Sequence, residues 1–227
     1  MFQGIVNLFY PRLCVLCNGS LLIAEKHICT ACDLDLPLTN FHLEKGNLLE
    51  KIFWGRTQLN RAFAFVYFKK GGSVQRMLHQ LKYKGNTELA EHIGLLYGNQ
   101  LQETIAKEKI DAVMAIPLHQ SKLRKRGYNQ SELFAKGLAE SLQIENLSNC
   151  IIRNIATETQ TKKSRFDRWQ NVESIFSVTQ LELLKNKHIL LVDDVITTGS
   201  TIEACANELL QIEGCKVSVA SIAAAIS

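Results

Sequence analysis

Residues 188–201, HILLVDDVITTGST, form the stretch of the sequence that decides the fold. Its short apolar run, residues 189–192, contains no charge, which is typical of a strand buried on both faces of a parallel sheet. Two acids and a turn rich in hydroxyl groups follow this run, and a helical pattern comes next. Ligands of such sheets bind at the carboxyl ends of the strands, so we expect the acids and the turn to lie at a binding edge.

The turn after the acids has the composition of an anion site. Gly199 lets the backbone approach a ligand closely, and the N–H groups that lead into the following helix would face an anion. The acids Asp193 and Asp194 suit ligand hydroxyl groups or a metal ion. A sugar phosphate carries both kinds of group. Four hydroxyl side chains add hydrogen-bond donors to the turn, namely Thr197, Thr198, Ser200 and Thr201.

The stretch resembles the phosphoribosyl pyrophosphate (PRPP) signature of type I phosphoribosyltransferases. This resemblance implies that the paired acids hold the ribose 2′- and 3′-hydroxyls and that the turn, residues 197–201, holds the 5′-phosphate. A core strand followed by a capped helix is the plainer alternative. A phosphorylation receiver domain opens with a similar strand, but it needs a whole domain after that strand. Only residues 195–227 remain here, so we exclude it.

Length and composition indicate one medium-sized domain with a small appendage. The chain has 227 residues, of which 46% are apolar and 21% charged, as in an ordinary globular protein. Its 26 basic and 22 acidic residues give a net charge of +4, too small to indicate a nucleic-acid partner by itself. Residues 1–13 lack the features of an export signal, and no stretch has the length of a membrane span. We therefore expect a cytoplasmic protein.

Four of the seven cysteines form two CxxC pairs, Cys14 with Cys17 and Cys29 with Cys32. Each pair can offer two thiolates from one turn, and together they complete a tetrahedral site for a structural zinc ion. A single CxxC could be a redox pair, whereas two favour a metal, with zinc or iron both open. His27 is a possible alternative ligand, but four cysteines already satisfy zinc, so we expect it at the surface. The other cysteines are expected to be small buried side chains, namely Cys150, Cys205 and Cys215.

The segment around the paired cysteines is too short to bury much apolar surface, so a metal would stabilise its fold. We predict a zinc-binding module over residues 1–45, a connector over 46–60 and a phosphoribosyltransferase-like domain over 61–227. The expected fold class is α/β, a parallel-sheet core with helices on both faces. Further strands are predicted at 62–68, 111–118, 174–178 and 216–224, and helices at 73–81, 86–106, 128–142 and 201–212.

A cationic loop is predicted directly after the strand at 111–118. Four positive charges within five residues suit a polyanion, although a solvated basic turn has the same composition. The position of this loop after a strand, in a chain that also carries the PRPP-like turn, favours the binding role. The residues concerned are Pro117, Leu118 and His119, followed by Lys122, Arg124, Lys125 and Arg126.

A second cationic stretch covers residues 151–171. Its polar, weakly periodic composition predicts a mobile loop, which could close on an anionic substrate as a lid or could be an exposed connector. Trp169 could stack on a base or anchor the loop on the core. The candidate lid cations are Lys162, Lys163, Arg165 and Arg168.

The ordered set of motifs resembles the ComF family, phosphoribosyltransferase-like proteins associated with bacterial competence for DNA uptake. The resemblance spans nearly the whole chain and implies PRPP bound with Mg²⁺, which bridges pyrophosphate and ribose oxygens. It also implies that the loop after residue 116 faces the pyrophosphate. The motifs are the two cysteine pairs, LKYKG at 81–85, IPLH at 116–119, RKRGYNQ at 124–130, TETQTKKSRFDRWQNV at 157–172 and VDDVITTGST at 192–201.

Two classes of function remain open. One is a Mg²⁺-dependent phosphoribosyltransferase, whose acceptor is unidentified because the sequence contains no recognisable base-binding element. The other is a catalytically silent competence factor that senses PRPP or binds single-stranded DNA, for which Tyr83 and Tyr128 could stack on bases beside the basic patches. A competence helicase or another uptake protein is a further candidate partner.

Overall fold

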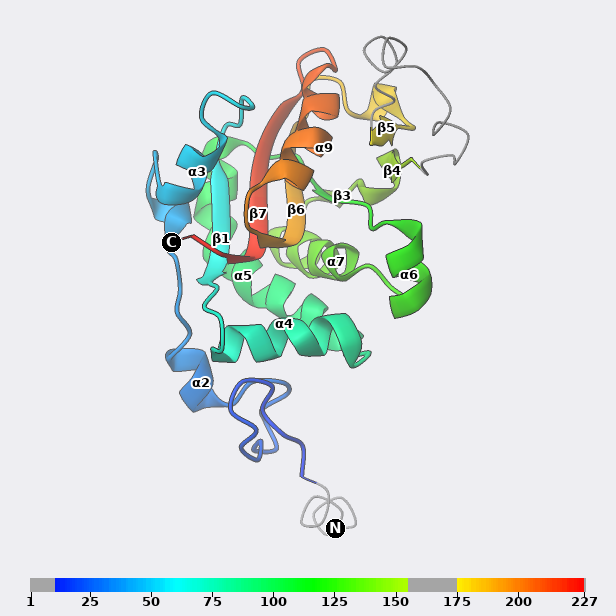
Figure 1. Cartoon of the computed structure of the whole chain (residues 1–227). Helices are drawn as coiled ribbons and strands as arrows, with labels where there is room; N and C mark the ends of the chain where they lie inside the picture. Colours follow the sequence, from blue (N-terminus) through cyan, green and yellow to red (C-terminus); the bar gives the residue numbers. More distant parts are fainter. Residues whose placement is uncertain (1–10, 155–174, 227) are drawn as a thin grey trace.

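A five-stranded parallel sheet forms the centre of the computed structural model, which describes residues 11–154 and 175–226 (Figure 1). Each neighbouring pair of strands runs parallel, which confirms the predicted α/β class. In spatial order the strands are β1 (Ala62–Tyr67), β7 (Lys216–Ala224), β6 (His188–Ile196), β2 (Ala112–Ala115) and β3 (Glu145–Asn146).

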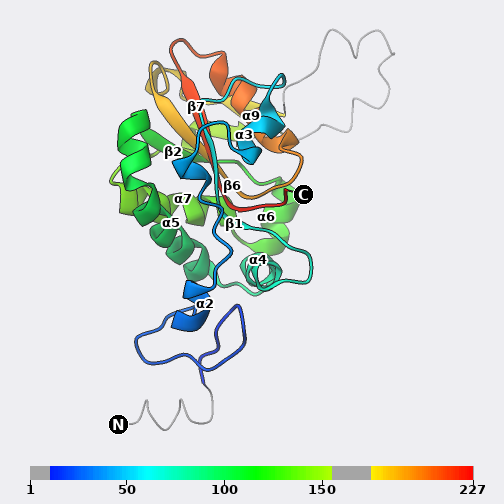
Figure 2. The ribbon, with the colours of Figure 1, turned by 90° about the vertical axis from the view of Figure 1, so that its left-hand side faces the viewer.

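Helices cover both faces of this sheet, as Figure 2 shows. Successive strand residues alternate between the faces: Phe63 and Phe65 belong to one apolar core, and Ala62 and Ala64 to the other. The first core contains residues of α4 (Ser73–Tyr83), α5 (Thr87–Glu108) and α7 (Gln130–Leu142). The second contains residues of α3 (Leu48–Phe53) and α9 (Ser200–Leu210).

The helices α5 and α7 pack with their backbones very close together, because Gly94 and Gly137 face each other at their crossing. A Cβ atom on Gly94 would lie 2.4 Å from the Phe134 carbonyl oxygen, and one on Gly137 would lie 2.1 Å from the Glu91 carbonyl oxygen. Real Cβ atoms do not approach so closely, so any larger residue would push the helices apart. These glycines therefore set the helix layer that supports β2 and β6.

The remaining elements are short. An antiparallel pair, β4 (Ile151–Arg153) and β5 (Phe176–Val178), flanks the segment whose residues 155–174 lie outside the described residues. The others are α2 (Thr30–Leu34), α6 (Gln120–Arg126), η1 (Phe41–Leu43), η2 (Ser148–Cys150) and η4 (Leu181–Leu183). In the part of the chain that the structure describes, no helix is both long and apolar enough to cross a membrane.

Residues 46–60, predicted as a connector, contain the helix α3. Asn47 caps it by accepting hydrogen bonds from the N–H groups of Leu49 and Glu50, and Leu49 and Phe53 are buried against the sheet. The predicted cationic loop likewise contains a helix, α6, at whose start His119 accepts a hydrogen bond from the Ser121 N–H. Helices of six or seven residues are too short to give a clear periodic pattern.

The N-terminal cysteine segment packs against the first core, below the sheet in Figure 1. Val15, Leu16 and Ile28 are buried together with residues of α4 and α5. The segment therefore shares its apolar contacts with the sheet domain.

Candidate functional site

The acid pair lies on β6 itself, at its carboxyl end. The strand continues through both acids because β7 pairs with it as far as Ile196. The Ser131 hydroxyl donates to Asp193 Oδ1 at 2.9 Å, and the Asp194 N–H donates to the same oxygen at 2.8 Å. Burial, with Asp194 as the second cause, raises the pKa of Asp193 to about 6. Lys82 Nζ lies 2.9 Å from Asp194 Oδ2, so one lysine balances part of the negative charge.

The turn after the acids encloses a small hollow of about 40 Å³, lined by Asp193 and residues 195–202. Gly199 adopts the left-handed conformation, φ +75°, as N-cap of α9, and a Cβ there would lie 2.6 Å from the Phe53 ring. Arg56 donates to the Thr198 carbonyl at 2.8 Å and pairs with Glu203. The hollow lies at the start of an eleven-residue helix, where the N–H groups and the helix dipole suit an anion. Phe53 and Arg56, from the segment around α3, contact the turn.

The predicted pyrophosphate segment follows β2, the strand beside β6. The Ile116 N–H donates to the Val192 carbonyl at 2.9 Å, which brings Pro117, Leu118 and His119 to the same edge as the acids. The buried Asn129 amide donates to the Ile116 carbonyl at 3.0 Å and ties this segment to the start of α7. The structure thus brings three predicted groups to one edge of the sheet.

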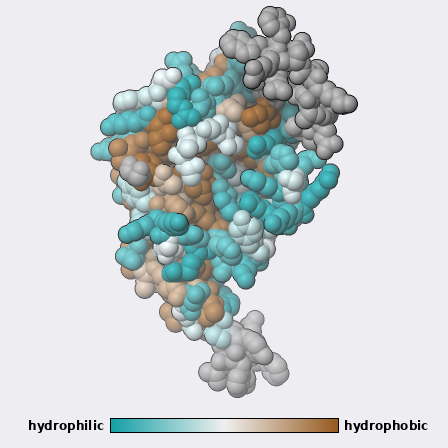
Figure 3. Space-filling model, viewed as in Figure 1, coloured by the Kyte–Doolittle hydropathy of each residue, from teal (hydrophilic) through white to brown (hydrophobic). Residues whose placement is uncertain are grey.

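The cations of the predicted pyrophosphate segment lie on α6. Lys122 and Arg124 are exposed, and hydrophilic surface covers this helix in Figure 3. Arg126 is engaged already: it donates to Gln130 Oε1 at 2.7 Å, and its guanidinium lies 5.5 Å from the centroid of the Tyr83 ring. The predicted lid cations and Trp169 lie outside the described residues, namely Lys162, Lys163, Arg165 and Arg168.

Several residues at this edge escaped the sequence interpretation. Ser131 directly follows the RGYNQ motif, and Lys82 lies inside the LKYKG motif, but neither motif indicates a contact with the acids. Phe53 and Arg56 come from the stretch predicted as a connector, where nothing in the sequence pointed to the turn. These residues are distant from the acids in the sequence and come close to them only through tertiary contacts.

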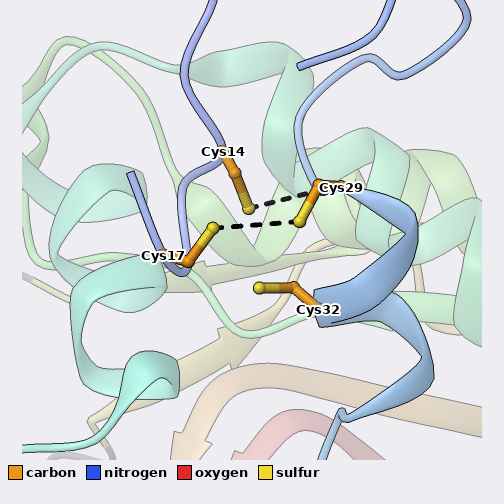
Figure 4. Close-up of side chains that lie close together, drawn as sticks. All are labelled: Cys14, Cys17, Cys29 and Cys32. Atoms are coloured by element: carbon orange, nitrogen blue, oxygen red, sulfur yellow. Dashed lines mark hydrogen bonds between the residues drawn. The ribbon is translucent and has the colours of Figure 1, made fainter. Parts of the chain in front are cut away.

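The four paired cysteines form a cluster, shown in Figure 4, whose sulfur atoms all lie within 4.8 Å of one another. A tetrahedral zinc ion with Zn–S bonds of about 2.3 Å needs sulfur atoms about 3.8 Å apart. The sulfurs of Cys17 and Cys29 are 3.8 Å apart. The Gly19 N–H donates to Cys17 Sγ at 3.3 Å. Cys14, Cys17, Cys29 and Cys32 therefore fit a four-thiolate metal site.

The surroundings of the cluster favour a thiolate at Cys14 but not at Cys32, whose pKa is raised by burial and by hydrogen bonds with the other three thiols. The pKa of Cys29 is raised as well. Burial raises the pKa of Cys14, but hydrogen bonds from backbone N–H groups, first that of Cys29, outweigh it and lower the pKa to about 6. His27, which we expected at the surface, is partly buried: its side chain is 14% exposed, and its ring lies 5.3 Å from that of His92. The three unpaired cysteines are buried as predicted, namely Cys150, Cys205 and Cys215.

Comparison with known proteins agrees with this arrangement. The profile of the phosphoribosyl transferase domain matches residues 128–227. The DNA utilization protein YhgH of Escherichia coli K12 is 31% identical over 218 residues, covering 88% of this chain and 92% of its own. Competence protein F of Haemophilus influenzae is 28% identical, covering 90% and 93%.

Among solved structures, the glutamine PRPP amidotransferase of B. subtilis shares 22% identity at a TM-score of 0.45. The match covers 63% of this chain and 30% of the amidotransferase, so the chain spans less than a third of that protein. The sheet, the domain profile and the relatives matched over most of their length together show that the chain belongs to the ComF family and has the type I phosphoribosyltransferase fold.

Proposed function

We propose that the chain binds PRPP with Mg²⁺ at the carboxyl edge of its sheet and transfers the phosphoribosyl group to an acceptor, releasing pyrophosphate. One observation carries this proposal: the acid pair, the hollow turn 197–201 and the segment 117–119 meet at one edge. A hollow for an anion beside two carboxylates suits a phosphate joined to a sugar that bears hydroxyl groups. The names of the relatives support a role in competence or DNA utilisation.

Each group has a distinct part in binding. Asp193 and Asp194 accept hydrogen bonds from the ribose hydroxyls, and the turn 197–201 donates to the 5′-phosphate. The segment 117–119 faces the pyrophosphate, with the cations of α6 beside it. The two carboxylates also offer the hard oxygen ligands that would suit Mg²⁺, and the ion would neutralise pyrophosphate charge when bound. The cations concerned are Lys122, Arg124 and Arg126.

The transfer needs no covalent intermediate on the protein. As the bond between ribose C1 and pyrophosphate breaks, positive charge develops on the sugar, next to the carboxylates of Asp193 and Asp194. The chain contributes by fixing the sugar and by stabilising this charge. Ser131 supports the reaction indirectly, because its hydroxyl holds the Asp193 carboxylate in place.

Calorimetric titration of Mg²⁺–PRPP into the metal-loaded protein tests the binding step. We expect Asp193→Asn/Asp194→Asn to weaken binding at least tenfold, because both charged acceptors of the ribose hydroxyls are lost. A folded wild-type protein that does not bind Mg²⁺–PRPP would refute the proposal. Phosphorus NMR then follows pyrophosphate release with candidate acceptors. Binding without release would favour the alternative, a silent PRPP sensor.

We also propose that residues 1–45 form a zinc-binding module attached through residues 46–60 to the phosphoribosyltransferase-like domain, residues 61–227. The geometry of the four sulfur atoms supports a structural ion with no open position for catalysis. Metal analysis of the purified protein should find one zinc ion per chain. Single-stranded DNA is a candidate partner for the exposed cations of α6, and salt-sensitive binding lost in Lys122→Ala/Arg124→Ala would support it.

A further inference from the structure

The acid pair has a counter-ion within the chain, the side chain of Lys82. Its Nζ lies 2.9 Å from Asp194 Oδ2, and the two side chains are 25% and 14% exposed. The charge of this lysine also reaches the other acid: burial and then Asp194 raise the pKa of Asp193, and Lys82 opposes them. Salt screens a partly buried ion pair only weakly, so this positive charge is a lasting part of the site.

Helix α4 holds Lys82 in this place. The lysine lies in the last turn of the helix, and the residue before it, Leu81, is fully buried. The Tyr128 hydroxyl donates to the Leu81 carbonyl at 2.6 Å and so ties the end of the helix to the RGYNQ motif. In Figure 1, α4 lies below the sheet, near the carboxyl end of β6. The lysine therefore approaches the acids from a separate, anchored element.

The two acids differ in the groups that already contact them. Asp193 Oδ1 accepts from the Ser131 hydroxyl and from the Asp194 N–H, which are neutral donors. Asp194 Oδ2 faces the ammonium group instead. Lys82 and Asp194 also line a cavity of about 360 Å³ between α4 and the end of β6, so ions from solution can reach the pair. A cation that binds Asp194 must displace the lysine or share the carboxylate with it.

The charge of Lys82 acts in opposite directions on a free metal ion and on a metal ion that arrives with PRPP. Two neighbouring carboxylates attract a free divalent cation, because hard cations prefer such oxygen ligands. The ammonium group of Lys82 repels that cation at close range. PRPP carries a pyrophosphate and a 5′-phosphate, so its complex with Mg²⁺ keeps a net negative charge, which the lysine attracts.

We propose that Lys82 is a positioning residue that keeps free divalent cations away from Asp194, so that the acid pair accepts Mg²⁺ only together with PRPP. The exclusion of free cations depends on the contacts of Lys82 alone, whereas the joint entry of Mg²⁺ and PRPP rests on the proposed function. When the complex binds, the Asp194 carboxylate becomes free for the ribose hydroxyls, and Lys82 remains beside the anionic ligand.

Electron paramagnetic resonance of Mn²⁺, a probe for Mg²⁺, tests the exclusion in the zinc-loaded protein without PRPP. We expect Lys82→Met to bind Mn²⁺ about tenfold more tightly than the wild type, because the repelling charge is lost while both acids remain. Lys82→Gln, a second neutral variant, should behave in the same way. Lys82→Arg keeps the charge and should bind Mn²⁺ as weakly as the wild type.

Calorimetric titration of Mg²⁺–PRPP into the same proteins should show the opposite change, with binding to Lys82→Met weakened by about threefold or more. A purely structural role of the lysine would not shift the two affinities in opposite directions. Lys136→Met is the matched control: Lys136 Nζ also lies 2.9 Å from a carboxylate, that of Glu91, but it is 62% exposed and belongs to α7. This variant should change neither affinity.

The double variant Lys82→Met/Asp194→Asn locates the metal ion, because it should lose the tight Mn²⁺ binding. If Lys82→Met and Lys82→Gln bind Mn²⁺ no more tightly than the wild type, or if the double variant keeps the tight binding, the exclusion by Lys82 is refuted. Tighter binding of Mg²⁺–PRPP to Lys82→Met would refute the joint entry. If the wild type does not bind Mg²⁺–PRPP, the proposed function fails, and the Mn²⁺ comparison still decides whether Lys82 excludes free cations.

Discussion

At the scale of single residues, Asp193 combines its proposed binding role with a cost in stability. Its pKa is raised to about 6 by burial and by Asp194, so its stabilising contribution is present at low pH and is lost as the pH rises through about 6. We expect Asp193→Asn to raise the free energy of unfolding at pH 7.5 by on the order of 1 kcal/mol, because the amide carries no buried charge. Urea unfolding at pH 7.5 measures this difference.

The same comparison at pH 5 supplies the check on this prediction. Wild-type Asp193 is then largely protonated, so the gain from the amide should shrink. Glu103→Gln, which removes an exposed carboxylate on α5, should change stability little at either pH. Equal stability of wild type and Asp193→Asn at both pH values would show that the charged carboxylate of Asp193 does not destabilise the fold.

Gly199 is the second residue whose chemistry is set by its position. An alanine there needs the left-handed backbone conformation, and its Cβ would lie 2.6 Å from the Phe53 ring. We expect Gly199→Ala to destabilise the fold by about 2–3 kcal/mol and to weaken Mg²⁺–PRPP binding, because the turn must move away from Phe53. Thermal unfolding and calorimetry measure the two effects.

Gly71→Ala separates the two causes of that loss. Gly71 has a similar φ of +80°, but a Cβ there would meet no atom within 4 Å. This variant should lose only about 1 kcal/mol, the cost of the left-handed conformation alone. If the two variants lose equal stability, the contact between Phe53 and the turn contributes nothing.

Residues within a motif could be predicted, but their partners could not. The signature identified the acids and the turn, because its residue types follow one another in the chain. Ser131 and Lys82 contact the acids across 62 and 112 positions, and no local pattern encodes such a contact. The cavity beside Asp194 escaped prediction for the same reason, since its walls come from α4 and β6.

At the scale of elements, α4 joins the cysteine cluster to the cavity of about 360 Å³ beside Asp194. The guanidinium of Arg76 donates two hydrogen bonds to the carbonyl of Leu16, which lies between Cys14 and Cys17. Another face of the same helix lines the cavity beside Asp194. Loss of the proposed zinc ion would therefore act, through α4, on the cavity beside Asp194.

Removal of the proposed zinc ion with a chelator tests this link. We expect hydrogen exchange of the α4 amides to become at least tenfold faster, because the cluster no longer holds the Leu16 carbonyl in place. Arg76→Ala should give part of this effect while it keeps the metal. The amides of α7, which lies away from the cluster, supply the internal control. Unchanged exchange in α4 after metal loss would show that the cluster does not support this helix.

Elements with a clear period were predicted well, whereas short ones were missed. The strand at Ala62–Tyr67 and the helix at Thr87–Glu108 agree with the expected ranges because long apolar patterns mark them. The helices α3 and α6 were interpreted as connector and loop. They depend on the caps Asn47 and His119 and on tertiary contacts, which the sequence pattern does not reveal.

At the scale of the whole molecule, one buried arginine ties together segments from both cores. Arg61 precedes β1, and its guanidinium donates to Glu50 of α3 at 2.8 Å and to Glu108 of α5 at 2.9 Å. It also donates to the Glu44 carbonyl at 2.8 Å. Since α3 carries Phe53, which packs under the Gly199 turn, this network links overall stability to the geometry of the proposed site.

Arg61→Met should therefore destabilise the protein by about 3–5 kcal/mol, because it leaves the largely buried carboxylate of Glu50 without its cation and that of Glu108 with only the exposed Lys45. Lys45→Met is the matched control: Lys45 also pairs with Glu108, but its side chain is 68% exposed, so its loss should cost less than about 1 kcal/mol. Urea unfolding at pH 7 measures both. Similar losses in the two variants would show that the buried network does not hold the segments together.

The pH dependence of this difference follows from Glu108. Burial raises its pKa, but Arg61 and Lys45 outweigh burial and lower the pKa below its ordinary value. The stability from a lowered pKa is present above the unfolded value and is lost as the pH falls through the folded value. The gap between wild type and Arg61→Met should therefore be constant near neutral pH and narrow below about pH 4. A gap that stays constant into acid would mean that Arg61 acts through its carbonyl contacts alone.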